Sequence, residues 1–319
     1  MVGLVMRSIY CDPRSDCLPR SNCLATDIGT SLSELRRISL HRVGGYDRVR
    51  PPRNTQGVLP FFYLPSLEEM SASIDDPLVA VFLWPTPQPP SSLSLTSLSL
   101  ANEIREPHLS QLLAAVPRLR ILRWVWFHDP GLEDQFDNPV INLDQLMPAL
   151  EQVRETLTEL TIPAGSGYGD RNGPPPLRVQ GSMRALANFD RLTKLFIPLV
   201  FFTGFELPAQ GRPGDCLPRN LEELTLTDDL LIFYDTDLPQ SWEESGYTGT
   251  IVTWLADVKS LTPRLRKLCL VSSNYDCELS LEDLEVRNKI QELGRHAGIE
   301  FTTKYEHYLG TIGTGSRGI

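Results

Sequence analysis

The chain has 319 residues and a formal net charge of −10, because 40 acidic side chains outnumber 30 lysines and arginines. This charge disfavours nucleic acids and anionic membranes as partners, since both would repel the protein. No apolar run comes near the length of about 18 residues that a membrane-spanning helix needs. The first ten residues also lack the apolar core and cleavage site of a secretion signal, so we expect a cytoplasmic or nuclear protein.

A motif of the form Leu-x-x-Leu-x-Leu recurs along most of the chain. Clear copies begin at Leu119, Leu157, Leu192, Leu221 and Leu265, looser ones begin at Leu35, Leu67 and Leu95, and a degenerate one lies near Ile299 and Phe301. Successive copies start 24 to 44 residues apart. Repeats of this length stack into solenoids, because each repeat covers the apolar face of its neighbour. We therefore predict an α/β solenoid rather than a compact two-domain protein.

Each copy predicts a short strand, and the residues after most copies predict a helix. The apolar side chains at positions four and six of the motif point inward, so the side chains at positions three, five and seven project from the opposite face. Apolar residues at helical spacing follow at 109–116, 143–153 and 281–293, with helix-start signals at Ser182 and Ser280. A strand, a turn and a helix repeated with one handedness build a parallel sheet backed by helices.

Stacked repeats share one core, so residues 31–303 are predicted to form a single unit. Residues 1–30 are predicted to be a poorly ordered N-terminal tail, and residues 304–319 a flexible C-terminal one. Long turns are expected around 129–142, 163–181 and 228–249.

The repeated copies resemble those of the leucine-rich-repeat family over about residues 32–302. Their long, uneven periods are similar to the repeats that follow F-box modules in fungal adaptor proteins. The resemblance implies a curved parallel sheet backed by helices and a role in recognising other proteins. The chain departs from the family at the ninth position of the repeat, where Asn or Cys often bonds the turn backbone. The five clear copies carry other residues there, so these turns must satisfy their backbone groups differently: Phe127, Gly165, Val200, Asp229 and Ser273.

The start of the chain bears on the role as an F-box adaptor. Leu18-Pro19, followed by Leu24 and Ile28, is similar to the first helix of an F-box, but the repeats begin at Leu35 and leave no room for the remaining helices. A complete F-box is therefore not expected in this chain. Two hypotheses follow: a standalone protein-binding scaffold, or a substrate receptor that binds the ubiquitin-ligase adaptor only if a longer form carries the box.

Patterns typical of catalysis and metal binding are not expected to form a site. The glycines at 165, 167 and 169 are followed by Asn-Gly-Pro-Pro-Pro, which blocks the helix that a dinucleotide site needs. Cys11, Cys17 and Cys23 are evenly spaced, but they lack the close pairs of a structural zinc site. Five histidines are scattered along the chain: His41, His108, His128, His296 and His307. We predict a non-enzymatic protein with no catalytic residue, metal or cofactor.

Charged and aromatic residues single out a candidate binding region. No Lys or Arg lies between Arg219 and Lys259, a span that is rich in acidic and aromatic side chains. We predict that this region binds a basic segment of a protein partner, since Trp and Tyr side chains anchor interfaces and charged side chains steer the encounter. The sheet alone offers on the order of 400 Å², against about 800 Å² per partner in a specific interface, so the long turns must contribute. The predicted binding residues are Arg123, Phe196, Glu223, Asp228, Asp229, Phe233, Tyr234 and Trp242.

Overall fold

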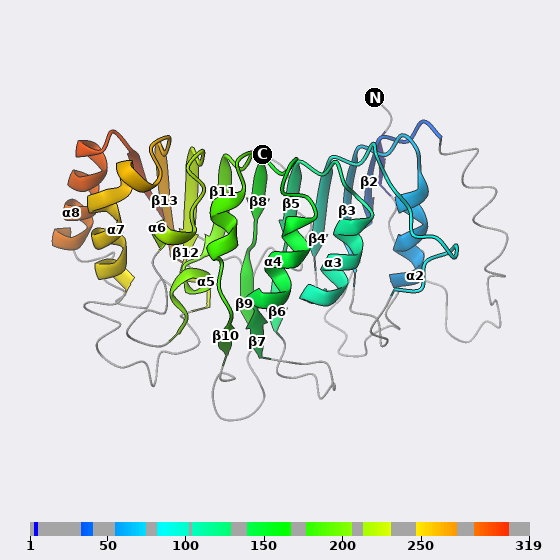
Figure 1. Ribbon diagram of the computed structural model, residues 1–319, viewed down its shortest axis with the longest axis horizontal. Coiled ribbons are helices and arrows are strands. Elements are labelled where there is room, and N and C mark those ends of the chain that lie inside the picture. The colour runs from blue at the N-terminus through cyan, green and yellow to red at the C-terminus, as the bar shows by residue number, and fades with distance from the viewer. Residues whose placement is uncertain are drawn as a thin grey trace.

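The computed structural model describes residues 3–5, 33–40, 55–74, 82–101, 104–128, 139–166, 177–205, 213–230, 247–272 and 284–305. These residues form an α/β fold around a ten-stranded sheet in the order β1-β2-β3-β4-β5-β8-β11-β12-β13-β14 (Figure 1). All neighbouring strands in it are parallel. Its strands are β1 (Gly3–Val5), β2 (Arg37–Leu40), β3 (Glu69–Ser73), β4 (Ser97–Ala101), β5 (Ile121–Trp124), β8 (Glu159–Thr161), β11 (Lys194–Pro198), β12 (Glu223–Thr227), β13 (Lys267–Ser272) and β14 (Glu300–Tyr305). The predicted parallel sheet is thereby confirmed.

Every copy of the repeated motif contributes one strand, and the strands pair in register. The residues at position four form one row across nine strands: Ile38, Met70, Leu98, Leu122, Leu160, Leu195, Leu224, Leu268 and Phe301. Burial alternates along the strands, as in β3 and β4, where positions four and six are buried and their neighbours are half-buried. The predicted inward and outward positions are therefore confirmed for positions three to six of these strands.

Helices lie on one face of the sheet, in front of it in Figure 1. The longer ones are α3 (Glu106–Ala114), α4 (Leu143–Glu151), α7 (Tyr247–Leu261) and α8 (Leu284–His296). The shorter ones are α2 (Thr55–Val58), α5 (Val200–Thr203) and α6 (Pro213–Cys216), with 3-10 turns η1 (Leu59–Tyr63) and η2 (Arg184–Asn188). Helices at 109–116, 143–153 and 281–293 are confirmed, with small shifts at their ends. At the start signal Ser182, the hydroxyl accepts a hydrogen bond from the Arg184 backbone N–H (3.2 Å), and the turn that follows is 3-10.

The inward side chains and the apolar faces of the helices form one continuous core, from Leu35 to Ile299. Trp124 is fully buried in it, and its indole N–H donates to the Ile104 carbonyl at 2.9 Å. Because each strand is covered by elements of its own and neighbouring repeats, the core extends along the sheet without a break. Within the described ranges, no helix combines the length and the apolarity needed to cross a bilayer.

Two additional pairs of strands extend the middle repeats, and three of these four strands, β7, β9 and β10, lie in segments that the sequence predicted to be long turns. Strand β6 (Trp126–His128) pairs in parallel with β9 (Ala164–Ser166), and β7 (Val140–Asn142) pairs with β10 (Arg178–Gln180). They lie below the main sheet in Figure 1. The Trp126 backbone N–H donates to the Pro163 carbonyl at 2.9 Å at the start of the first pair. Backbone pairing thus satisfies groups that a side chain at the ninth position would otherwise have to bond.

Residues at both ends of the sheet belong to strands that the sequence placed in tails. Strand β1 lies within the predicted N-terminal tail and pairs with β2, which covers the backbone edge of β2. Lys304 and Tyr305, predicted to begin the C-terminal tail, pair with Val271 and Ser272 as the end of β14. The rest of both tails lies outside the described residues.

Candidate functional site

The side chains at positions three and five form the outer face of the sheet, opposite the helices. Position three carries mainly charged residues: Arg37, Glu69, Ser97, Ile121, Glu159, Lys194, Glu223, Lys267 and Glu300. Position five carries mainly short hydroxyl residues: Ser39, Ser71, Ser99, Arg123, Thr161, Phe196, Thr225, Cys269 and Thr302. The outer face therefore has a border of charged residues at position three beside a row of short, polar side chains at position five.

The charged border largely neutralises itself, because its signs alternate from β8 to β14 and opposite charges on adjacent strands pair. Lys194 Nζ lies 2.9 Å from Glu159 Oε1, and this hydrogen bond raises the pKa of Lys194. Lys267 Nζ lies 3.1 Å from Glu223 Oε1. At the other end, Arg37 pairs with Glu69 at 2.9 Å. Exposed pairs of this kind each stabilise a protein by at most about 1 kcal/mol, so their main effect is to favour this register and to balance the surface charge.

A second row of polar contacts lies one residue before the strands, at position two. The hydroxyl of Thr158 donates to the Arg120 carbonyl at 3.0 Å, and that of Thr193 donates to the Thr158 carbonyl at 3.2 Å. Thr96 makes the equivalent bond to the Glu68 carbonyl at 3.3 Å. These threonines link successive repeats through side-chain bonds at the start of the strands, a role that was not predicted from the sequence.

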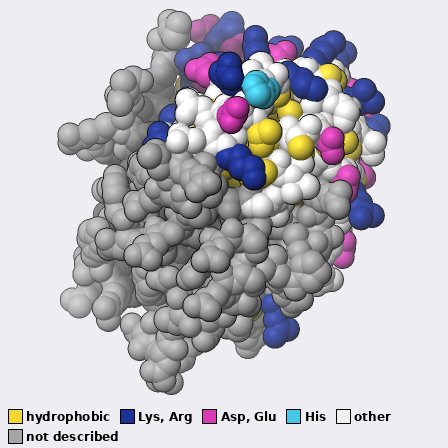
Figure 2. All heavy atoms as spheres, turned by 90° about the vertical axis from the view of Figure 1, so that its left-hand side faces the viewer, with side chains coloured by type: hydrophobic (Ala, Val, Ile, Leu, Met, Phe, Trp, Pro, Cys, Tyr) yellow, Lys and Arg dark blue, Asp and Glu magenta, His cyan; other side chains and the backbone are white. Residues whose placement is uncertain are grey.

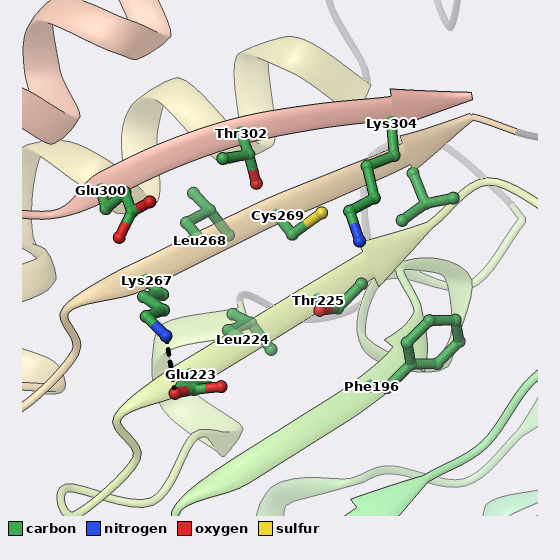
Figure 3. A pocket seen from close by; sticks show the side chains of 11 residues that line it. Phe196, Glu223, Leu224, Thr225, Lys267, Leu268, Cys269, Glu300, Thr302 and Lys304 are labelled. Atoms are coloured by element: carbon green, nitrogen blue, oxygen red, sulfur yellow. Dashed lines mark hydrogen bonds and ion pairs between the residues drawn. The ribbon is translucent and has the colours of Figure 1, made fainter. Parts of the chain in front are cut away.

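A pocket of about 290 Å³ opens on the outer face over β11 to β14 (Figure 3). Position-five side chains from the four strands line its floor and one wall: Phe196, Thr225, Cys269 and Thr302. The Lys267–Glu223 ion pair and Glu300 lie at the end where the strands begin, and Lys304 lies toward the end where they finish. In Figure 3 the Lys304 side chain extends from β14 toward Thr225. The pocket thus combines an aromatic wall, small hydroxyls and charges of both signs.

Of the five predicted binding residues that the structure describes, it brings two together in the pocket. Phe196 and Glu223 both line the pocket. Arg123 is half-buried on the outer face of β5 but lies outside the pocket, because β8 separates β5 from β11. Phe233, Tyr234 and Trp242 lie outside the described residues.

Asp228 and Asp229 are buried, with exposed fractions of 3% and 4%. Asp228 Oδ2 accepts a hydrogen bond of 2.6 Å from the Ser272 hydroxyl, and Asp229 Oδ2 accepts one of 2.9 Å from the Thr227 hydroxyl. Thr227, expected to project outward at position seven, is itself 1% exposed. In this structure the Asp228 carboxylate therefore links the end of β12 to the end of β13, while Asp229 bonds back to the end of β12, and neither lies on an exposed acidic surface.

Sequence reasoning did not identify the contribution of β14 to the pocket. Its copy of the repeat is degenerate, with Phe301 at position four and Thr303 at position six. Extending the register from the preceding copy would have placed Glu300, Thr302 and Lys304 on the outer face. The missing signal was an apolar residue at position six, where β14 has Thr303.

A buried polar cluster lies between α3 and β6, away from the pocket. Glu106 is 3% exposed and accepts a hydrogen bond of 3.3 Å from the Asn142 backbone N–H, and burial raises its pKa. The Arg105 guanidinium lies 5.0 Å from the centroid of the Trp126 ring, and that ring stacks on His128 at 6.4 Å. Because Glu106, Trp126 and His128 are all buried, the cluster is best explained as a packed connection between α3, β6 and α4. Among the described residues, no group of three or more His, Cys, Asp or Glu side chains could hold a metal ion.

Comparison of the chain with protein-family models, with curated proteins and with solved structures gives no match. The outer face of the sheet can hold an extended partner against a row of short hydroxyl side chains, with an aromatic ring and unlike charges near one end.

Proposed function

We propose that the chain is a leucine-rich-repeat solenoid that binds another protein through the outer face of its sheet and catalyses no reaction. The observation that carries this proposal is the row at position five. Six of its nine residues are Ser or Thr, so most side chains of the row are short and carry hydrogen-bonding groups: Ser39, Ser71, Ser99, Thr161, Thr225 and Thr302. Nine strands about 4.8 Å apart make this surface roughly 40 Å long.

The pattern of larger side chains along this row supports a binding surface. Only Arg123, Phe196 and Cys269 interrupt the hydroxyls. Arg and aromatic residues are enriched at the energetically important positions of interfaces, and short polar neighbours leave such side chains accessible to a partner. The dispersed charges of the border then favour the correct alignment of the partner over long-range attraction. The chain binds its partner in the cytoplasm or nucleus. Delivery of that partner to a ubiquitin ligase would require a longer form of the protein that carries an F-box.

A site-specific photo-crosslinking experiment tests the proposal. A photoreactive phenylalanine analogue replaces Ser99 on the outer face of β4 in the chain expressed in its native host. The control places the same analogue at Glu151, which is exposed on α4 on the helical side. We expect a discrete cross-linked protein from position 99 and none from position 151. The same products from both positions, or products from position 151 alone, would contradict the proposal.

A further inference from the structure

The pocket over β11 to β14 contains two unpaired charges of opposite sign. Glu300 at position three and Lys304 at position seven of β14 are both exposed, and neither has an ion-pair partner within the part of the chain that the structure describes. Lys267 differs from them because Glu223 already neutralises it. Four residues along a strand span about 13 Å, so the two side chains leave β14 about 13 Å apart, with Glu300 at one end of the pocket and Lys304 at the other.

The space between the two charges offers small groups with unused hydrogen-bonding capacity. Thr225 and Thr302 make no side-chain hydrogen bond to another described residue, and the Cys269 thiol lies between them as a free cysteine (Figure 3). The Phe196 ring forms the apolar wall of the same pocket. A ligand that lies along β14 would therefore meet a carboxylate, then the Thr302 hydroxyl beside the Cys269 thiol, and then an ammonium group.

From this arrangement we infer that the pocket binds an extended peptide segment that carries a basic and an acidic side chain four residues apart. In an extended chain, residues i, i+2 and i+4 face the same way, and i and i+4 lie about 13 Å apart. The basic side chain pairs with Glu300 and the acidic one with Lys304. The residue between them on the same face is small or apolar, because it packs against Thr302 and Cys269. This inference rests on the proposed function and specifies the partner's chemistry.

The separation of the two charged residues excludes a free amino acid as the ligand. The charges of a free amino acid are too close together to reach both ends of the pocket. An extended segment can place one side chain at each end and one between them.

Selection from a peptide library with a charge-swapped variant tests the inference. The probe is a library of displayed eight-residue random peptides, and the whole chain is the target. The test variant is Glu300→Lys with Lys304→Glu, which preserves composition and net charge. The control is Lys289→Glu with Glu292→Lys, an equal swap at exposed positions of α8. Figure 2 views this end of the molecule, where basic and acidic side chains are already interspersed.

We expect the wild-type chain to enrich peptides with unlike charges at i and i+4. Such a peptide should bind the test variant at least about tenfold more weakly, and exchanging its two charges should restore the affinity. The control swap should change nothing, and Lys304→Ala should weaken binding without rescue by the exchanged peptide. Enriched peptides that lack the i, i+4 pair, or that bind the test variant unchanged, would overturn the inference.

Replacing Ser99 with Trp distinguishes failure of the inference from failure of the proposed function. This change obstructs the outer face at β4, away from the pocket. Longer library peptides that lose affinity for Ser99→Trp but ignore the charge swap would refute the inference and leave the proposed function standing. If neither change affects any enriched peptide, or if no peptide is enriched over a blank surface, both the inference and the proposed function fail.

Discussion

Phe127 and Gly165 are backbone partners in the ladder between β6 and β9, at the ninth position of two successive repeats. This additional pair of strands satisfies the backbone groups of both turns. The middle repeats are therefore lengthened without leaving the turn's polar groups unpaired, which accounts for their long and uneven periods.

Removing an inward side chain should destabilise the fold far more than removing its outward neighbour. Leu224 at position four of β12 is 1% exposed within the continuous core, so Leu224→Ala should lower the free energy of unfolding by about 2–5 kcal/mol. Thr225→Ala, one residue further along, should change it by less than about 0.5 kcal/mol. Urea denaturation of both variants measures the difference. Equal losses would show that burial in β12 does not alternate as described.

The buried carboxylate of Asp228 should contribute to stability through Ser272. Asp228→Ala leaves the Ser272 hydroxyl without this acceptor and should cost about 1–3 kcal/mol. Ser272→Ala should cost less, and the double variant should lose less than the sum of the two single changes, because the residues share one hydrogen bond. A double-mutant cycle in urea measures this coupling. Strictly additive losses would mean that the bond between these side chains does not stabilise the protein.

Glu106 should make the stability depend on pH in the direction opposite to that of a salt-bridged carboxylate. Burial raises its pKa in the folded protein above the ordinary value of 4.5. The folded state therefore holds its proton more tightly than the unfolded state does, and this contribution to stability is lost as the pH rises from 4.5 through the raised pKa. Glu106→Gln should remove this loss. The stability of the variant relative to the wild type should increase over that range, and a constant difference across pH would contradict the assignment.

The two described cysteines should differ in reactivity. Cys216 is 2% exposed, and burial raises its pKa to about 11, so its thiol should resist iodoacetamide at pH 8 in the folded protein. Cys269 is half-buried in the pocket and should react sooner. Peptide mapping by mass spectrometry measures both sites. A peptide bound in the pocket should protect Cys269 and leave Cys216 unchanged, whereas faster labelling of Cys216 would refute the described burial.

The sheet was predictable from the sequence because leucine at positions four and six dictates both the strand and the face that it buries. Leu195 and Leu224, for example, both stand at position four of the motif, and they are register partners in the sheet. Helix α7 was not predicted, since its interior contains the β-branched residues Thr250, Ile251 and Val252, which have low helix propensity. Its helical state therefore depends on tertiary packing, in which Ile251, Trp254 and Val258 are buried.

The candidate site was less predictable than the sheet. Charge and aromatic content drew attention to Asp228 and Asp229, but a local count of charges does not reveal burial or hydrogen bonding to Ser272 and Thr227. The contribution of Lys304 depends on the register of β14, whose apolar pattern is too weak to be recognised as a repeat. Register is a property of neighbouring strands, so it must be known before side chains from different repeats can be placed together.

The affinity of a captured partner for an obstructed outer face tests the central claim most directly. The protein cross-linked from position 99 is purified, and its dissociation constant is measured for the wild type, for Thr225→Trp in the pocket and for Gln291→Trp at an exposed position of α8. Thermal melting of each variant confirms that it remains folded. Binding through the outer face predicts that Thr225→Trp raises the dissociation constant by at least about tenfold, while Gln291→Trp leaves it unchanged. Equal affinity for all three proteins, or a loss confined to Gln291→Trp, would contradict it.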